Sequence, residues 1–181
     1  IRLSLVGSEM CIRDSSLAAY CAISSSKGFD GPLRWEDGRI HAIPQDYADM
    51  TGWTELARIV KNAYNSLTAE EKNRTAIFTE NYGQAGAIRY HTLKDGLPEP
   101  ISFSDNFLLW APGNVDIDVL IYVNDDTSDV SKYFTEITKV GQITDRWARE
   151  YGLPVFLCKQ PQNDFALFYR NKLHELRSRY D

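Results

Sequence analysis

The sequence predicts an α/β fold in which a mostly parallel sheet lies between two layers of helices, a three-layer Rossmann-like sandwich. Short runs rich in β-branched residues alternate with amphipathic segments of helical period, which is the pattern of βαβ units. One run, Asp118–Val123, is apolar enough to be a central strand that is buried on both faces. The length of 181 residues suits one domain with a single core.

The first 41 residues are predicted to lie outside this domain. Residues 1–15 resemble the translation of a sequencing-library adapter and do not begin with methionine, so we interpret them as an artefact of sequence assembly. Residues 16–41 are mostly polar and contain several Gly and Ser residues, which is typical of a linker. The single α/β domain is therefore predicted over residues 42–181.

The elements of the domain follow from the hydrophobic period along the chain. Residues 42–50 are predicted to be extended, because Pro44 disfavours helix at the residue before it. Apolar residues recur at helical spacing from Trp53 to Leu67, and Thr51 can cap the start of this helix. A charged turn then leads into a predicted strand over residues 75–79.

Later elements are predicted from the same patterns and from the positions of Gly and Pro. The predicted strands cover residues 101–103, 118–123, 140–144 and 153–158. The predicted helices cover residues 84–90, 128–134 and an amphipathic C-terminal segment that uses Phe165, Phe168, Tyr169, Leu173 and Leu176.

Charge and cysteine content exclude some classes of function. The net charge is −5 without a basic stripe, so we predict no nucleic-acid partner. Cys11, Cys21 and Cys158 form no CxxC pair and no histidine lies at metal-ligand spacing from them, so neither a metal site nor a cofactor is predicted. Cys21 and Cys158 either form a disulfide in an oxidising compartment or remain free thiols, with Cys158 buried in a strand.

The segment Thr79–Ala87 carries the main candidate binding site. It follows a strand and begins a helix, which is where open α/β sheets bind ligands. Glu80, Asn81, Tyr82 and Gly83 are the candidate residues, since a glycine allows close approach and a helix start offers free N–H donors. The pattern is Gly-x-x-Gly and lacks the lysine of a nucleotide-binding loop. The alternative is that its glycines serve a tight turn and helix packing.

Two acidic motifs flank the central strand. Asp116 and Asp118 place two carboxylates on one face, as in the D-x-D motif of nucleotide-sugar transferases, but they precede the strand and fit a solvated start better. The residues Asn124–Asp126 follow the strand and are interpreted as the capping turn of the next helix.

The loop Asp105–Gly113 mixes polar and aromatic residues. Asn106 and Trp110 are candidate ligand-binding residues in this loop, because such mixtures suit sugar stacking or a protein interface. Packing of Phe107 and Trp110 beneath the loop is the alternative. The histidines are scattered and no nucleophile signature is present, so no catalytic residue is predicted.

Three segments resemble a known family in the same order and at similar spacing: Pro44–Trp53, Ala76–Ile88 and Asp105–Gly113. Together they resemble the C-terminal soluble region of bacterial glycosyltransferases of the family 39-like group. This group is related to dolichyl-phosphate-mannose protein mannosyltransferases, and its superfamily includes the lipid A aminoarabinose transferase. The chain departs from the pattern at Leu109 and Ala111, where the family tends to have tryptophan and glycine.

The resemblance implies an extracytoplasmic (periplasmic) accessory domain of a polytopic membrane glycosyltransferase that uses a polyprenyl-phosphate-linked sugar. The catalytic carboxylates of the family lie in an early loop between membrane helices, and no position of this chain matches that loop. The implied partners are the transmembrane part of the same polypeptide and a glycan or lipid-linked acceptor. Two alternatives stay open: a freestanding soluble α/β module that binds a sugar or phosphorylated metabolite, and a domain that only braces the transferase.

Overall fold

The computed structural model describes residues 33–162 and 164–179. These residues divide into two compact units, which we describe separately: residues 33–51 with 147–149, and residues 52–146 with 150–179. The predicted adapter, Cys11 and Cys21 lie outside the described residues, as does most of the predicted linker.

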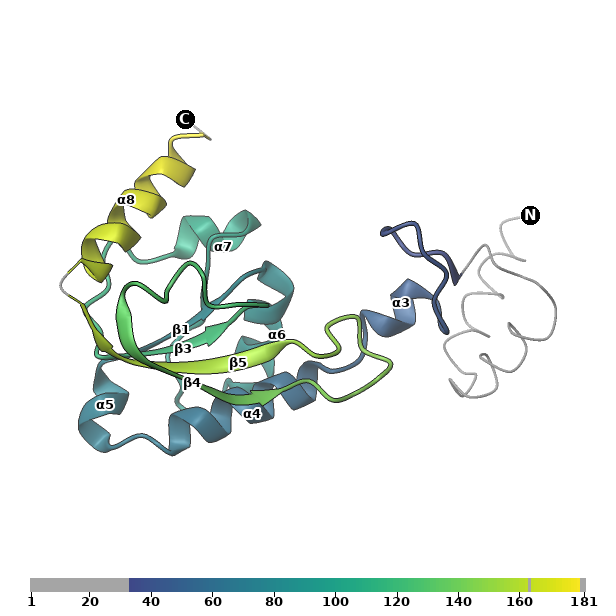
Figure 1. Ribbon diagram of the computed structural model, residues 1–181, viewed down its shortest axis with the longest axis horizontal. Helices are drawn as coiled ribbons and strands as arrows, with labels where there is room; N and C mark the ends of the chain where they lie inside the picture. The colour runs from purple at the N-terminus through teal and green to yellow at the C-terminus, as the bar shows by residue number, and fades with distance from the viewer. Residues whose placement is uncertain (1–32, 163, 180–181) are drawn as a thin grey trace. The chain divides into compact units, whose positions relative to one another are not determined.

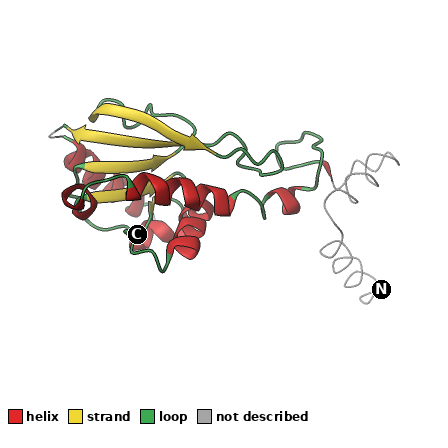
Figure 2. Cartoon of the chain, turned by 90° about the horizontal axis from the view of Figure 1, so that it is seen from below, coloured by secondary structure: helices red, strands yellow, loops and turns green. Residues whose placement is uncertain are grey.

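The larger unit contains one five-stranded sheet with the strand order β2-β1-β3-β5-β4. Figure 2 shows its strands, in yellow, side by side. Strand β1 pairs in parallel with β2 and β3, whereas β5 pairs antiparallel with β3 and β4. The sheet is therefore mixed, and its antiparallel pairings together join more residue pairs than its parallel ones. The strands are β1 (Thr75–Thr79), β2 (Ile101–Ser102), β3 (Val119–Val123), β4 (Phe134–Gln142) and β5 (Pro154–Pro161).

Helices cover both faces of this sheet (Figure 1). Helices α7 (Asp105–Trp110) and α8 (Phe165–Arg177) share one apolar core with alternate residues of β3, Leu120 and Tyr122. The other residues of β3 point to the opposite face, where helix α4 (Trp53–Asn65) contacts the sheet and helix α6 (Tyr82–Thr92) packs against α4. The remaining helix of this unit is α5 (Ala69–Asn73).

The sequence explains why the main elements form where they do. Strand β3 is buried at every position, as its continuous apolar run predicts. Helix α4 buries the face on which its apolar residues recur, including Leu56 and Val60. Helix α5 begins at a capping box in which Thr68 accepts a hydrogen bond from the backbone N–H of Glu71, and the Glu71 side chain accepts one from the backbone N–H of Thr68.

The α/β class is confirmed, but a mostly parallel sheet is not. Parallel neighbours need a crossover, usually a helix, and the helix predicted over residues 128–134 would have supplied one. Residues 128–133 form turns instead, and β4 follows directly from Phe134. Strands β4 and β5 then pair antiparallel. At the start and end of the loop that connects them, the backbone N–H of Ile143 donates to the carbonyl oxygen of Leu153, and the N–H of Gly152 donates to the carbonyl oxygen of Ile143.

Other expectations for single elements were wrong in detail. Residues 45–48 form the short helix α3 (Gln45–Ala48) where an extended segment was expected. Gly52, with a φ of 85°, occupies the N-cap of α4 in place of Thr51, since this left-handed conformation suits glycine. The Asp105–Gly113 loop contains helix α7, and strand β4 begins at Phe134, well before the strand predicted from residue 140.

The smaller unit has its own contacts. An antiparallel bridge joins Arg34 to Ile40, and the Trp35 ring stacks on His41 with 3.6 Å between centroids. The indole N–H of Trp35 donates to the carbonyl oxygen of Ile43 at 2.8 Å. These contacts give residues 33–43 a defined local structure.

Candidate functional site

The polar residues after β1 mainly serve the start of helix α6. The Asn81 side chain accepts a hydrogen bond from the backbone N–H of Gln84 at 3.0 Å. The Gln84 side chain in turn accepts from the backbone N–H groups of Glu80 and Asn81, at 3.2 and 3.5 Å. This is a capping box, which satisfies N–H groups that a ligand would otherwise have to satisfy.

Gln84 is the residue of this turn that the sequence prediction missed. Its side chain is fully buried, and its amide nitrogen donates to a carboxylate oxygen of Glu150 at 3.0 Å. The signal was present as Asn-x-x-Gln at the helix start, the polar pattern of a capping box. The contact with Glu150, however, joins residues that are far apart in the sequence.

Glu80 lies in an acidic environment at the carboxyl end of β1. Partial burial raises the pKa of its carboxyl group, and the negative charges of Asp125 and Glu150 raise this pKa further. Burial, together with the charges of Asp129, Asp126 and Glu80, also raises the pKa of the nearby Tyr122 to about 12. These negative charges therefore disfavour phosphate and other anions beside the Glu80 carboxylate.

Tyr82 and Gly83 complete the predicted group. Tyr82 is exposed on the first turn of α6, so its ring is accessible. Among the described glycines, those with positive φ do not include Gly83 or Gly86, so neither supplies a left-handed turn. A Cβ atom on Gly83 would come within 3.2 Å of the Asn81 side chain, whereas one on Gly86 would meet open space. Of these two glycines, Gly83 is therefore the one with a packing reason to be glycine.

The carboxylates of the D-x-D motif bind an arginine. Arg74 forms a bidentate pair with Asp116, at 2.8 and 3.1 Å, and a further bond with Asp118 at 2.7 Å. All three side chains are well exposed, so the group stabilises the fold only weakly. Within residues 33–162 and 164–179, no group of three or more His, Cys, Asp or Glu residues could hold a metal ion.

The turn after β3 is built by its own side chains. One carboxylate oxygen of Asp126 accepts from both the backbone N–H and the hydroxyl of Ser128, each at 2.7 Å. The prediction that Asn124–Asp126 caps a following helix was wrong, because turns and then β4 follow it, and the polar side chains stabilise the turn itself. Cys158 is buried in β5 as predicted, and burial raises the pKa of its thiol to about 12.

A cavity of about 760 Å³ lies beside the end of helix α7, and we call it the α7 cavity. Trp110 lines it with an exposed fraction of 65%, and its ring meets the Phe107 ring edge to face at 5.3 Å. An ion pair of 3.0 Å between Arg89 and Glu99 adds polar groups to the lining. The other lining residues are Thr75, Ala76, Pro98, Pro100, Ile101, Ala111, Pro112, Val115 and Ile117.

The structure separates the predicted site residues into two groups. Glu80, Asn81, Tyr82 and Gly83 follow the end of β1, whereas Trp110 lines a cavity that touches the start of β1 at Thr75 and Ala76. A five-residue strand separates these ends by roughly 13 Å. Asn106 is exposed in the first turn of α7 and does not line the α7 cavity.

The contents of the α7 cavity suit binding better than catalysis. An exposed aromatic ring offers a flat apolar face, and a charged pair beside it offers hydrogen-bond donors and acceptors. A few polar groups in a largely apolar, concave lining are typical of small-molecule sites. The lining contains no histidine or cysteine and no hydroxyl other than that of Thr75.

The comparisons with known proteins do not identify a family for this chain. No protein-family model matches the chain, and neither a curated protein nor a solved structure matches it. Among the described residues, no helix has both the length and the apolar character needed to cross a membrane.

Proposed function

We propose that the α7 cavity binds carbohydrate and that the domain acts as the extracytoplasmic accessory domain of a polytopic membrane glycosyltransferase. In this proposal the transferase uses a polyprenyl-phosphate-linked sugar, and the domain binds a glycan or lipid-linked acceptor. The domain itself carries out no chemical step. Catalysis belongs to a transmembrane part of the same polypeptide, which would also be the partner of this domain.

The observation that carries the proposal is the exposed Trp110 ring at the α7 cavity. An indole ring exposed over most of its surface loses contact with water when it stacks on the apolar face of a sugar ring. Arg89 and Glu99 lie in the same lining and can bond to sugar hydroxyl groups.

The segments that resemble the glycosyltransferase group give the second support. Two of the three, Ala76–Ile88 and Asp105–Gly113, contribute residues to the α7 cavity, including Ala76, Phe107 and Trp110. In this proposal, the parts of the two segments that lie nearest to each other border one cavity, at Ala76 and within residues 107–112.

The binding proposal is tested by calorimetric titration with gluco-, manno- and chito-oligosaccharides. We expect at least one class to bind, and we expect Trp110→Ala to weaken that binding at least about fivefold, because stacking on an aromatic ring is worth roughly 1 kcal/mol or more. Leu109→Ala is the matched control, since Leu109 is equally exposed on α7 but does not line the cavity. Equal binding by both variants would contradict the proposal.

The transferase context is tested on the source DNA by long-read sequencing upstream of Ser16. Several apolar spans of about 20 residues, with acidic residues in the first loop outside the cytoplasm, would support it. A start codon directly before Leu17, or an unrelated soluble sequence, would instead favour a freestanding α/β module that binds a sugar. If the context is found but no oligosaccharide binds, a bracing role for the domain is the remaining explanation.

A further inference from the structure

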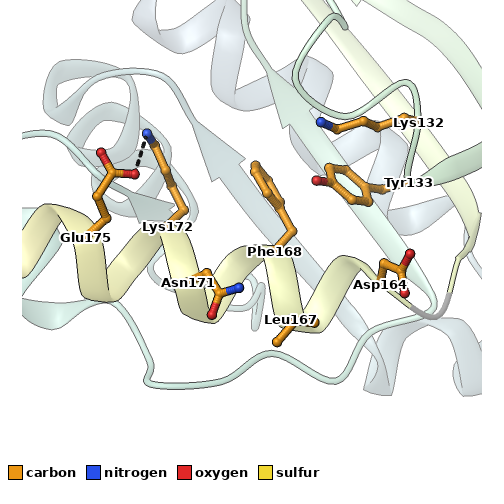
Figure 3. Close-up of a pocket in the computed structure, with 8 residues that line it drawn as sticks. All are labelled: Lys132, Tyr133, Asp164, Leu167, Phe168, Asn171, Lys172 and Glu175. Carbon is orange, nitrogen blue, oxygen red and sulfur yellow. Dashed lines mark hydrogen bonds and ion pairs between the residues drawn. The ribbon is translucent and has the colours of Figure 1, made fainter.

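A second cavity, of about 770 Å³, lies along helix α8, and we call it the α8 pocket (Figure 3). It is formed by the first three turns of α8 and by Lys132 and Tyr133, which precede β4. None of its lining residues lines the α7 cavity, so it is a separate site. Figure 3 shows Phe168 between Lys172 on one side and Tyr133 with Lys132 on the other.

The first notable feature of the α8 pocket is the position of Lys132. The rings of Tyr133 and Phe168 stack with 4.5 Å between their centroids. The ammonium group of Lys132 lies 5.0 Å from the centroid of the first ring and 5.9 Å from that of the second. Within the described part of the chain, Lys132 makes no ion pair, so its charge is available to an anion.

The second feature is Lys172, which forms only a weak, exposed ion pair with a carboxylate. Lys172 pairs with Glu175 at 3.2 Å, one turn further along α8, and Glu175 also pairs with Arg179. All of these groups are well exposed, and exposed pairs within one helix contribute little. An incoming anion can therefore take the ammonium group of Lys172 while Arg179 keeps Glu175 paired.

The third feature is an aromatic crevice of about 200 Å³ that shares Phe168 and Lys172 with the α8 pocket. The crevice is partly open to solvent, and most of its lining is aromatic or aliphatic. It has room for a flat apolar group beside the lysine. Its other lining residues are Phe78, Phe103, Leu120, Tyr122, Asp129, Val130, Phe165 and Tyr169.

We infer that the α8 pocket binds an organic anion that carries an aromatic ring. The ring lies against Phe168 and reaches into the aromatic crevice, and the anionic group, a phosphate or a carboxylate, bonds to Lys132 and Lys172. Three carboxylates line the same space: Glu175, which pairs with Lys172 and Arg179, and Asp164 and Asp129, which form no ion pair within the described residues. They lower the affinity for an anion, and removal of Asp164 should raise it.

The inference is tested by calorimetric titration of the full chain with phenyl phosphate and with benzoate. We expect saturable binding of at least one of them. Phenol and inorganic phosphate should bind much more weakly, because phenol lacks the anionic group and inorganic phosphate lacks the aromatic ring. Comparison of phenyl phosphate with benzoate distinguishes a phosphate site from a carboxylate site. Absence of saturable binding of both aromatic anions would overturn the inference.

Variants then assign the binding to this pocket. Lys132→Gln and Lys172→Gln should each weaken binding about tenfold, because each removes a charge-assisted bond. Asp164→Asn should strengthen it, and the exposed Lys94→Gln should leave it unchanged. All of these side chains lie at the surface, so circular dichroism should confirm folded variants. Binding that is insensitive to both Lys132→Gln and Lys172→Gln would contradict the inference.

Discussion

The two ends of strand β1 differ in how their polar and aromatic residues are used. At the carboxyl end, Asn81 and Gln84 bond to backbone groups of the helix start, and the surroundings are acidic. At the amino end, Trp110 is exposed beside a cavity of about 760 Å³. Open α/β sheets usually bind ligands at the carboxyl ends of their strands. In this protein the polar groups at the carboxyl end of β1 bond to the start of helix α6, whereas the exposed Trp110 ring and the α7 cavity lie at the amino end.

A position at the carboxyl end of a strand and the start of a helix is therefore not sufficient to make a binding site. The donors at a helix start bind a ligand only when side chains of the chain do not already satisfy them. Variants at both ends of β1 test which of their polar residues stabilise the fold.

Gln84→Ala is expected to cause the largest loss of stability, about 2–3 kcal/mol of the free energy of unfolding. The change removes a buried amide and leaves the backbone N–H of Glu80 without its side-chain acceptor and Glu150 without its donor. Urea denaturation measures the effect. Gly86→Ala on the same helix is the control, since its Cβ would meet open space, and it should preserve or increase stability. A loss below that caused by surface substitutions would contradict a structural role for Gln84.

Asn81→Ala is expected to lower the free energy of unfolding by about 1 kcal/mol, the usual cost of a lost N-cap. The backbone N–H of Gln84 loses its acceptor at 3.0 Å. Asn81→Asp should retain most of the stability, because aspartate also caps helices. Equal stability of the alanine variant and the unmodified chain in thermal and urea unfolding would show that the cap is dispensable.

Arg74→Gln is expected to lower the free energy of unfolding by less than about 1 kcal/mol, because the ion pairs with Asp116 and Asp118 are exposed. The loss should shrink as salt is added, since salt screens exposed charges. Denaturation at low and high ionic strength measures this. A loss that does not depend on salt would mean that Arg74 acts through packing.

Glu80→Gln tests the acidic environment through the dependence of stability on pH. The pKa of Glu80 is raised in the folded state, so ionisation costs folded-state stability as pH rises through that pKa. The variant should therefore gain stability relative to the unmodified chain on going from about pH 4 to pH 7, with no such gain below the unfolded-state pKa. The exposed Glu136→Gln controls for the general loss of one negative charge. A gain that is independent of pH, or equal in the control, would contradict the pKa shift.

Much of the fold could be predicted from the sequence because the signals are local. Strand β1 was predicted with the correct bounds, and the hydrophobic period located α4, β3 and α8. The direction of the later strands could not be predicted, since it depends on whether residues 128–134 form a helix or turns. The polar residues in this region have a similar preference for helix caps and turns.

The candidate site could be predicted only in part, for two physical reasons. Asparagine and glutamine at a helix start suit a capping box and a ligand site equally, so Asn81 was interpreted as a ligand residue although it caps α6. The α7 cavity combines residues as distant in sequence as Ala76, Arg89 and Trp110, and only the fold brings them together. Trp110 was identified because an exposed aromatic residue in a polar segment is itself a local signal.

The most direct test compares Asn81→Ala and Trp110→Ala in two measurements, thermal unfolding and titration with the best-binding oligosaccharide. We predict that Asn81→Ala lowers the melting temperature and keeps the affinity, whereas Trp110→Ala keeps the melting temperature and loses the affinity. Loss of oligosaccharide affinity in Asn81→Ala, together with unchanged affinity in Trp110→Ala, would place the ligand at the carboxyl end of β1 and contradict the carbohydrate role of the α7 cavity.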